Sequence, residues 1–382
     1  MNPQESRAAA PPFVSATPAV LSHDGQELLS FAGCNYLGLA HDPIVLGAAR
    51  DALDRYGLST SASRQTSGNT LEHDELEREI ATFFGFESAL LTPDGYTANL
   101  AAAQALARDH RIALIDERAH HSLRDAARVA GLAIAMYDHL DARDAARMTR
   151  ELGAQGVVIM TDGVFATDGA IAPLPQLLDA LPERGASLLV DDCHGFCVLG
   201  RHGRGTLDHF QLADPRVRLT TTLAKGLGCS GGVVCADDAW IDHARCASSA
   251  AVCTTPAPPP SAAAARRALR LLDQDPTRFD HLRQNIDLVR SALRDAGYAA
   301  HDEPIPVFAI WRSTEDQTRA LADALLRRGI FIPASAYPGG PAPVYLRISV
   351  TAMHKPEQIQ RLADALRTLA AADHVVCEPR IA

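Results

Sequence analysis

Lysine is rare in this chain, which carries two lysines beside 34 arginines, and Lys225 lies where a lysine could do chemistry. Arginine keeps its proton in proteins, whereas burial or a neighbouring cation lowers the pKa of a lysine towards neutrality. A neutral amine forms Schiff bases with carbonyl groups. Lys225 follows the run Thr220–Thr222 and precedes Gly226, so the sequence predicts a reactive amine in a glycine-rich turn. Lys355, just before Pro356, is expected at the surface start of a helix.

Polar residues also end two other apolar runs. Asp191, Asp192 and His194 follow the run Leu188–Val190. A carboxylate buried there needs a cationic partner, which the protonated ring nitrogen of a cofactor would supply. A helix N-cap or a structural ion pair is the alternative explanation for the same residues. His120 follows another apolar run and could either present its ring to a planar ligand or cap a helix.

A third cluster, Thr92–Asn99, is predicted to be a turn that opens an alanine-rich helix. Backbone amides at a helix N-terminus attract phosphate, Gly95 permits close approach, and Tyr96 could cover a ring. Thr222 precedes Lys225 by three residues. Together the clusters offer an amine, a pyridinium partner, a ring-facing histidine and a phosphate cradle. A pyridoxal phosphate enzyme requires this set from its protein.

The clusters lie at the ends of segments that predict a parallel sheet. Apolar runs alternate with helical patterns from about residue 41 to 275, which indicates a sheet covered on both faces, with ligands beyond the carboxyl ends of its strands. The expected strands are 89–91, 112–115, 157–160, 188–190, 219–223 and 232–236, and the expected helices lie near 72–84, 97–108, 122–130, 141–152 and 173–181.

The remaining segments predict a smaller second domain. A long helical region at 261–296 is followed by strands at 307–311, 330–332 and 344–350 and by helices near 315–328 and 356–372. We therefore expect an α/β fold with an N-terminal arm at 1–40, a large cofactor-binding domain at 41–275 and a small α+β domain at 276–382.

Composition narrows the classes of partner and compartment. The formal net charge is −10 and basic residues are scattered, which argues against nucleic acid as a partner. No apolar run reaches 18 residues and the N-terminus is polar, so we expect no membrane span, no secretory signal and a cytoplasmic location. The eight cysteines lack paired spacing, and Cys193–Cys197 has no second ligand pair, so we expect no metal site and no disulfide framework.

The order of these motifs resembles the α-oxoamine synthase family of fold-type I pyridoxal phosphate enzymes. That family includes 8-amino-7-oxononanoate synthase, 2-amino-3-ketobutyrate ligase, 5-aminolevulinate synthase and serine palmitoyltransferase. The resemblance runs from Asn35–Leu39 to Leu346–His354 and covers most of the chain. The landmarks between them are Ser67–Thr70 with His73 and Glu77, Asp162–Phe165, Asp168–Gly169, Val190–Gly195 and Gly203–Gly205.

The resemblance implies a role for each candidate residue. Lys225 would hold the cofactor and then act as the base at the substrate Cα, while Asp191 would pair with the pyridine nitrogen. His194 would contact the phenolic oxygen and His120 would stack on the ring. The other implied site residues are Gly95, Tyr96 and Thr222 around the phosphate, Thr255 from the second subunit of a homodimer, Arg347 at the amino-acid carboxylate, and Asn35 as a further substrate-positioning residue.

The implied reaction is the decarboxylative condensation of a small α-amino acid with an acyl thioester, carried on coenzyme A or a carrier protein, to give an α-amino ketone, carbon dioxide and a free thiol. The commonest precedent is 8-amino-7-oxononanoate synthase. Substrates like those of serine palmitoyltransferase or 2-amino-3-ketobutyrate ligase stay open, as do aldol cleavage and transamination. A non-catalytic partner subunit would lack the Schiff-base lysine, which this chain retains.

Two departures from the family pattern lie near the expected pocket. Phe196 and Cys197 follow Gly195 where the family usually has small residues, and Ala166 stands where serine is common. These changes would reshape the pocket without removing any residue that the cofactor needs. The sequence therefore predicts the reaction class and leaves the substrates open.

Overall fold

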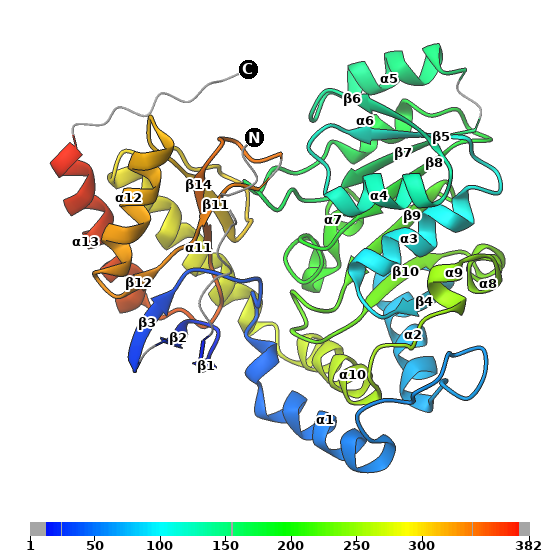
Figure 1. The fold of residues 1–382 in the computed structure, drawn as a ribbon, viewed down its shortest axis with the longest axis horizontal. Helices are drawn as coiled ribbons and strands as arrows, with labels where there is room; N and C mark the ends of the chain where they lie inside the picture. The colour runs from blue at the N-terminus through cyan, green and yellow to red at the C-terminus, as the bar shows by residue number, and fades with distance from the viewer. Residues whose placement is uncertain (1–12, 24, 154–155, 338, 374–382) are drawn as a thin grey trace, which may run out of the picture.

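A seven-stranded sheet lies at the centre of the larger part of the computed structural model, which describes residues 13–23, 25–153, 156–337 and 339–373 (Figure 1). The strand order is β4-β10-β9-β8-β7-β5-β6. Strands β5 to β9 pair in parallel, whereas β10 is antiparallel to β4 and β9, so the predicted mostly parallel sheet is confirmed. Its strands are β4 (Ser88–Thr92), β5 (Ile112–Asp116), β6 (Ala133–Tyr137), β7 (Val157–Asp162), β8 (Ser187–Asp191), β9 (Val217–Thr222) and β10 (Gly232–Ala236).

Helices cover both faces of this sheet because successive strand residues point to opposite sides. In β8, Leu188 and Val190 join one apolar cluster while Leu189 joins the other. The Leu189 face packs against α3 (Gly95–Leu106), α4 (His121–Val129) and α8 (Asp238–Ala247). The opposite face packs against helices that include α2 (Leu71–Phe84), α5 (Ala142–Glu151), α6 (Leu174–Asp179), α7 (Gly205–His209) and α10 (Pro259–Gln274).

Side-chain caps fix where the helices nearest the site begin. Asp94 accepts a hydrogen bond from the Thr97 amide at 2.7 Å, so α3 begins at Gly95, directly beyond the carboxyl end of β4. Thr70 and His73 form a capping box at the start of α2. Asp42 caps α1 (Pro43–Tyr56) through the Ile44 amide at 2.8 Å. Neither α1 nor α8 is among the helices that the sequence patterns predict.

The long helical region expected at 261–296 is divided in the structure. Helix α10 ends at Gln274, Asp275 is extended with φ −134° and ψ 92°, and α11 runs from Thr277 to Asp295. Pro276 explains the break, because proline lacks an amide hydrogen and disfavours helical geometry in the residue before it. We propose that the domain boundary expected near 275 lies at this break.

The N-terminal segment belongs to the C-terminal part of the molecule. Residues 15–30, expected as an extended arm, contain three strands, and β3 pairs in parallel with β12 (Figure 1). A separate three-stranded sheet has the order β11-β14-β13. The elements of this part are β1 (Ser15–Ala16), β2 (Val20–His23), β3 (Gln26–Ser30), β11 (Val307–Ile310), α12 (Glu315–Leu326), β12 (Ile330–Phe331), β13 (Ala334–Ser335), β14 (Tyr345–Ser349) and α13 (Pro356–Asp373).

Short elements complete the described chain. These are the 3-10 turns η1 (Leu39–His41) and η2 (Arg201–Gly203) and the helix α9 (Ser249–Val252). Among the described residues, no helix is both long enough and apolar enough to cross a membrane. The expected N-terminal residues 1–12 of the arm lie outside the described part of the chain.

Candidate active site

A cavity of about 140 Å³ lies at the carboxyl ends of the strands, where the sequence places its polar clusters. Strands β4, β7, β8 and β9 end at this edge, and Thr92 and Thr222 flank Gly232 of β10. The predicted residues that line the cavity are Gly95, Tyr96, His120, Asp191, His194, Thr222 and Lys225. Seven residues from four separate clusters of the sequence therefore line one small cavity, as a single cofactor site requires.

Of the two consecutive aspartates, Asp191 lines the cavity and Asp192 does not. Asn99 Nδ2 donates to Asp191 Oδ2 at 2.7 Å, and the Cys193 amide donates to Asp191 Oδ1 at 3.1 Å. Asp192 is completely buried, and its Oδ2 accepts the Thr206 amide at 2.9 Å. Burial raises the pKa of Asp192 to about 7. Asp192 therefore has a structural place behind the site, and Asp191 presents its carboxylate to the cavity.

Two histidines border the cavity as uncharged rings. Burial lowers the pKa of His120, and it lowers the pKa of His194 well below the usual range, with a further contribution from the nearby charges of Lys225 and Arg347. His120 Nδ1 lies 2.6 Å from Ser122 Oγ at the start of α4. A neutral, half-buried imidazole is suited to lie against a flat ring.

The phosphate end of the candidate site is narrow. A Cβ atom added to Gly95 would lie 2.9 Å from Thr222 Cβ, so only glycine permits this approach of α3 to the end of β9. The first amides of α3 carry the positive end of the helix dipole, which favours an anion. Tyr96, the next residue of α3, also lines the cavity, and its hydroxyl donates a hydrogen bond to Asp125 Oδ2 at 2.8 Å.

Arg347 lies beside the cavity and is held by the residue at one of the sequence departures. Its Nε donates to the backbone oxygen of Ala166 at 2.6 Å, a contact that needs no side chain at position 166. Its Nη2 donates to Tyr36 Oη at 3.4 Å and to Cys34 Sγ at 3.5 Å. Arg347 is therefore held between Ala166, which lines the cavity, and two residues of the N-terminal segment.

Asn35 does not line this cavity. Its Oδ1 accepts the Ala40 amide at 3.4 Å, and its Nδ2 lies 3.5 Å from His41 Nδ1. The neighbouring Cys34 and Tyr36 point towards Arg347 instead. The sequence patterns assign no role to either of them, although Tyr36 lies in the Asn35–Leu39 motif and Cys34 directly precedes it.

Thr255 is exposed and does not line the cavity of its own chain. Its segment is fixed on both sides, because Ser63 Oγ donates to the Val252 oxygen at 2.6 Å and His73 Nε2 donates to the Ala257 oxygen at 2.8 Å. An exposed residue on a fixed segment is what we expect if Thr255 contacts the cofactor of a second subunit, and this contact stays a proposal.

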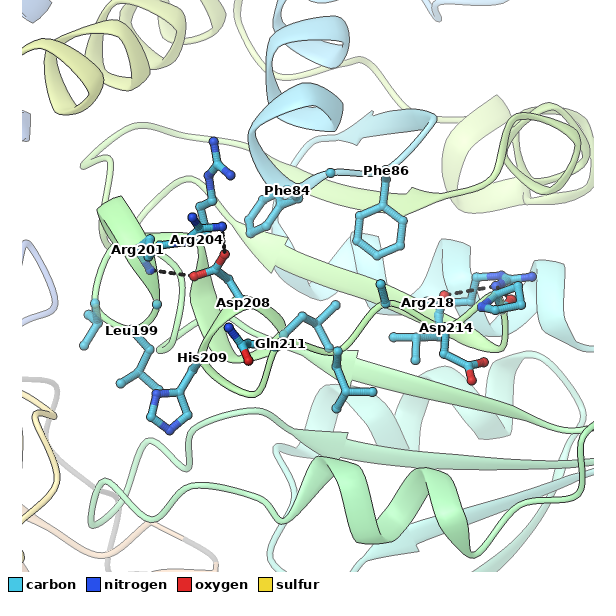
Figure 2. A pocket seen from close by; sticks show the side chains of 18 of the residues that line it. Phe84, Phe86, Leu199, Arg201, Arg204, Asp208, His209, Gln211, Asp214 and Arg218 are labelled. Carbon is cyan, nitrogen blue, oxygen red and sulfur yellow. Dashed lines mark hydrogen bonds and ion pairs between the residues drawn. The ribbon is translucent and has the colours of Figure 1, made fainter.

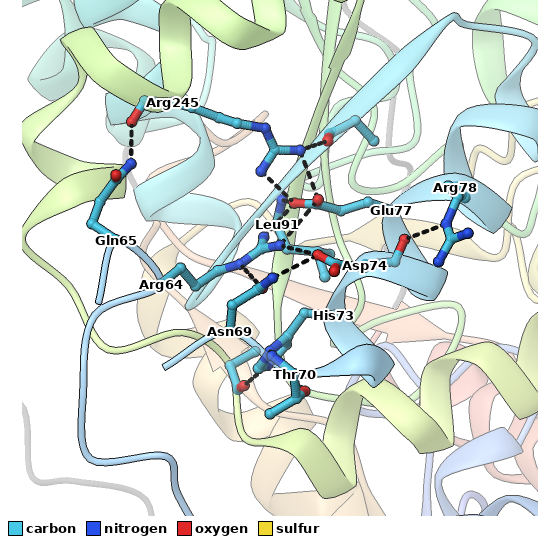
Figure 3. Close-up of polar contacts among 12 residues, drawn as sticks. Arg64, Gln65, Asn69, Thr70, His73, Asp74, Glu77, Arg78, Leu91 and Arg245 are labelled. Carbon is cyan, nitrogen blue, oxygen red and sulfur yellow. Dashed lines mark hydrogen bonds and ion pairs between the residues drawn. The ribbon is translucent and has the colours of Figure 1, made fainter. Parts of the chain in front are cut away.

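A buried carboxylate anchors the same region. Figure 3 shows Arg64 and Arg245 converging on Glu77 of α2, and Arg245 Nη2 lies 2.6 Å from Glu77 Oε2. The Leu91 amide also donates to Glu77 Oε1 at 2.7 Å. These contacts join the loop before α2, helix α8 and strand β4, and Ser63 and His73, which hold the segment around Thr255, lie in that loop and in α2.

Sequence reasoning missed other residues that line or support the cavity. Ser122 and Asp162 line it, and the ring of Tyr337 stacks against His120 with centroids 6.1 Å apart. Burial and the charge of Asp191 raise the pKa of Asp162 well above its usual range. Asp162 ends β7 and lies in the landmark Asp162–Phe165, whereas the only sequence signal for Ser122 is its position at the start of α4.

A larger cavity, of about 860 Å³, lies at the opposite edge of the sheet (Figure 2). Phe84 and Phe86 line one side of it, and Asp208 and Asp214 lie across from them. It lies near Val217, where β9 begins, and contains none of the predicted site residues. The size of a cavity therefore does not identify the reactive centre here, whereas the convergence of titratable side chains does.

The residues around the small cavity fit pyridoxal phosphate. Lys225 supplies the amine, Asp191 a carboxylate for a ring nitrogen, His120 a flat neutral ring and Gly95 a passage that admits a phosphate to the start of α3. Each group stands on a different element, and all face one space.

Comparisons with known proteins agree with this geometry. Residues 26–366 match the family "Aminotransferase class I and II". The chain is 37% identical over 345 residues to 8-amino-7-oxononanoate synthase of Methylococcus capsulatus, covering 90% of this chain and 89% of that one. It is 38% identical over 346 residues to the enzyme of the same name from Pseudomonas paraeruginosa, covering 90% and 86%.

Solved structures show the same fold. Serine palmitoyltransferase from S. paucimobilis, solved with bound PLP and myriocin, matches with a TM-score of 0.89 and 25% identity over 94% of this chain and 91% of that one. Serine palmitoyltransferase of Sphingomonas wittichii matches with a TM-score of 0.89 and 27% identity over 94% and 92%. The predicted fold class and cofactor are thereby confirmed, and the chain is a pyridoxal phosphate-dependent acyltransferase that belongs to the α-oxoamine synthases within the class I and II aminotransferase family.

Proposed function

We propose that the protein condenses L-alanine with a pimeloyl-type thioester, on coenzyme A or a carrier protein, to form 8-amino-7-oxononanoate. The product in the name of the curated relatives supports these substrates. Its amino-bearing carbon with a methyl group corresponds to alanine after loss of the carboxylate, and the rest of its chain corresponds to an acyl group with a free terminal carboxylate. The observation that carries the proposal is the convergence of Lys225, Asp191 and His194 on one cavity beside Arg347.

The residues divide the work of this reaction. Arg347 binds the amino-acid carboxylate, because the Ala166 oxygen holds Nε, Tyr36 and Cys34 contact Nη2, and Nη1 has no hydrogen bond to any described residue. Lys225 removes the proton from Cα and holds it. Pyridoxal phosphate, when bound, supplies the electron sink that stabilises the resulting carbanion. Asp191 keeps the ring nitrogen protonated, which strengthens that sink.

The lining of the cavity favours alanine over serine. Ala166, whose backbone oxygen contacts Arg347, and Val164 are both apolar residues of the lining. The methyl group of alanine would pack against these residues at no desolvation cost. The hydroxyl of serine would lose its hydrogen bonds to water and gain none from the apolar side chains. Serine palmitoyltransferase-like and 2-amino-3-ketobutyrate ligase-like substrates are the competing outcomes of the test below.

A substrate matrix tests the proposal. L-alanine, glycine and L-serine are each paired with pimeloyl, acetyl and palmitoyl thioesters, while thiol release and carbon dioxide from carboxyl-labelled amino acid are measured together. We expect equal amounts of both products and the highest kcat/KM with L-alanine and a pimeloyl thioester. Thiol release without carbon dioxide would mean hydrolysis or N-acylation. Turnover of the amino acid without a thioester would mean aldol cleavage or transamination.

The proposal includes a cytoplasmic homodimer with two shared sites. None of the seven described cysteines forms a disulfide, as is usual in a reducing compartment. The exposed position of Thr255 on an anchored segment is consistent with a contact to the cofactor phosphate of a second chain. Sedimentation together with turnover per chain on dilution tests this arrangement, since a fully active monomer would contradict it.

A further inference from the structure

Tyr36 is a buried tyrosine of the Asn35–Leu39 motif to which the proposed reaction gives no role. Its hydroxyl oxygen lies 2.7 Å from His194 Nδ1 and 3.4 Å from Arg347 Nη2. Tyr36 is 1% exposed, so solvent does not compete for these contacts. One hydroxyl therefore joins the residue expected at the cofactor oxygen to the residue expected at the substrate carboxylate.

The direction of these hydrogen bonds follows from the chemistry of the groups. A guanidinium only donates, so the Tyr36 oxygen is the acceptor in its contact with Arg347. The single hydroxyl hydrogen of Tyr36 is then free to point at His194 Nδ1, and the distance of 2.7 Å is that of a good hydrogen bond. Burial raises the pKa of Tyr36 well above its usual range, so the hydrogen is retained.

His194 has one ring proton to place. Burial lowers its pKa well below the usual range, and the nearby charges of Lys225 and Arg347 act in the same direction, so the ring is neutral. A neutral imidazole carries its proton on one nitrogen and accepts at the other. If Nδ1 accepts from Tyr36, the proton must be on Nε2, which makes Nε2 a donor.

We propose that Tyr36 is a positioning residue that fixes His194 in the form protonated at Nε2, so that this histidine donates a hydrogen bond to the phenolic oxygen of the cofactor. The proposal rests on the proposed function, in which His194 faces that oxygen. Without the Tyr36 hydroxyl, His194 Nδ1 loses its donor. The ring then populates both neutral forms, and the form protonated at Nδ1 offers no hydrogen from Nε2.

One neighbouring thiol competes for the same hydroxyl. Burial alone would raise the pKa of Cys34, but the charges of Arg347 and Lys225 outweigh burial and lower it. A Cys34 thiolate would draw the Tyr36 hydrogen away from His194 at high pH. The groups that face this pair are thus Cys34 and Arg347 around Tyr36, and Lys225 and His120 around His194.

The direct test measures which nitrogen of His194 carries the proton. The full chain, loaded with pyridoxal phosphate and labelled with ¹⁵N-histidine, is studied by two-bond ¹H–¹⁵N correlation near neutral pH, and the His194 signals are identified as those lost in His194→Gln. We expect the wild-type ring to be protonated at Nε2. A proton on Nδ1 in the wild type would overturn the proposal, and this result needs no variant at Tyr36.

Tyr36→Phe then tests the cause. We expect mixed protonation of His194, an upward shift in the pH midpoint of the cofactor absorbance, and a fall in kcat of about tenfold or more with little change in the thioester KM. Tyr137→Phe is the control, because it removes another buried tyrosine hydroxyl, at the end of β6. A Tyr36→Phe chain whose His194 is still protonated only at Nε2 would overturn the proposal.

The two proposals fail in different ways. Failure of the proposed function appears in the substrate matrix, whichever nitrogen of His194 is protonated. Failure of the positioning role appears in the ¹⁵N spectrum, even when L-alanine and a pimeloyl thioester react as expected. Restoration of the wild-type spectrum in Tyr36→Phe after alkylation of Cys34 would also count against Tyr36, because it would assign the effect to the thiol.

Discussion

Asn99 Nδ2 donates to Asp191 Oδ2 over 2.7 Å, and the orientation of this amide is fixed by its other contacts. Thr220 Oγ1 donates to Asn99 Oδ1 at 2.6 Å, and a reversed amide would place two acceptors, Asn99 Oδ1 and Asp191 Oδ2, against each other. The same Nδ2 contacts Ser122 Oγ at 2.8 Å, and that oxygen lies 2.6 Å from His120 Nδ1. One side chain of α3 therefore links the carboxylate and the histidine that are proposed to contact the cofactor ring.

Replacing this amide with a carboxylate should disable the site while preserving its shape. In Asn99→Asp, a second negative charge beside Asp191 would raise the pKa of its carboxyl, and the lost amide would leave Asp191 Oδ2 without its donor. We expect kcat to fall about 100-fold, with weaker cofactor binding, as measured by turnover and by absorbance titration with pyridoxal phosphate. Gln104→Glu, an isosteric change of the same kind on the same helix, should remain within about threefold of wild type.

Lys225→Ala and Lys225→Arg should both abolish turnover. The Lys225 amine must lose its proton to form a Schiff base, and a guanidinium keeps its proton at any pH that the fold tolerates. The absorbance band of the covalently held cofactor should vanish in both variants. Lys355→Arg provides the matched control, since it removes the only other lysine of the chain and should leave both band and rate unchanged.

Arg347→Lys should separate the two substrates. Lysine keeps the charge but loses the planar fork that binds a carboxylate, and it also loses the Nε contact to the Ala166 oxygen at 2.6 Å. We expect the KM for the amino acid to rise about tenfold or more, while the KM for the thioester changes by less than about twofold. Steady-state kinetics with each substrate varied in turn measures both values, and an equal rise in the two would place Arg347 elsewhere in the reaction.

Stability should fall in mild acid because of His354. Its Nδ1 accepts the Thr351 amide at 3.0 Å, its Nε2 contacts the Ser30 oxygen at 2.9 Å, and burial lowers its pKa from 6.5 to about 4. Between about pH 4 and pH 6.5, His354 is protonated in the unfolded chain but stays neutral in the folded chain. The stabilisation is therefore complete above pH 6.5 and is lost as the pH falls towards 4.

The expected size of this effect is about 2 kcal/mol between pH 7 and pH 5. Urea unfolding of wild type and His354→Gln at both pH values measures it as the change in their difference in free energy of unfolding. His281→Gln, at an exposed histidine, is the control and should show no such change. A difference between wild type and His354→Gln that does not vary with pH would contradict the prediction.

The part of the site that the sequence predicts well is the part built from strand ends. Asp191, Thr222 and the turn at Gly95 each follow an apolar run, and parallel strands bring their carboxyl ends to one edge. The pattern of apolar runs followed by polar residues is therefore enough to predict that these residues lie close together in the fold. The edge strand β6 was missed for the opposite reason, because most of its residues are exposed and its pattern is weak.

Contacts between segments that are far apart in the chain cannot be predicted from the pattern of apolar and polar residues. Cys34 and Asn35 are neighbours in an irregular turn, where neither the two-residue repeat of a strand nor the 3.6-residue repeat of a helix predicts which side chain faces inward. In the structure Cys34 faces Arg347, whereas Asn35 contacts Ala40. The hydrogen bond between Tyr36 and His194 joins residues that are 158 positions apart in the chain. Thr255 depends on a second chain, about which neither pattern nor packing within one chain gives direct evidence.

The pairing of β3 with β12 has a consequence for how the protein folds while it is being synthesised. Leu29 and Ile330 lie opposite each other, about 300 residues apart in the chain. At a synthesis rate of about 5–20 residues per second, the first strands would leave the ribosome at least about 15 s before their partner exists. The seven-stranded sheet, complete by Ala236, can form in that interval. Tyr36 and Arg347 can come into contact only after that interval. A nascent chain would therefore form the residues that hold the cofactor before those that bind the amino-acid carboxylate.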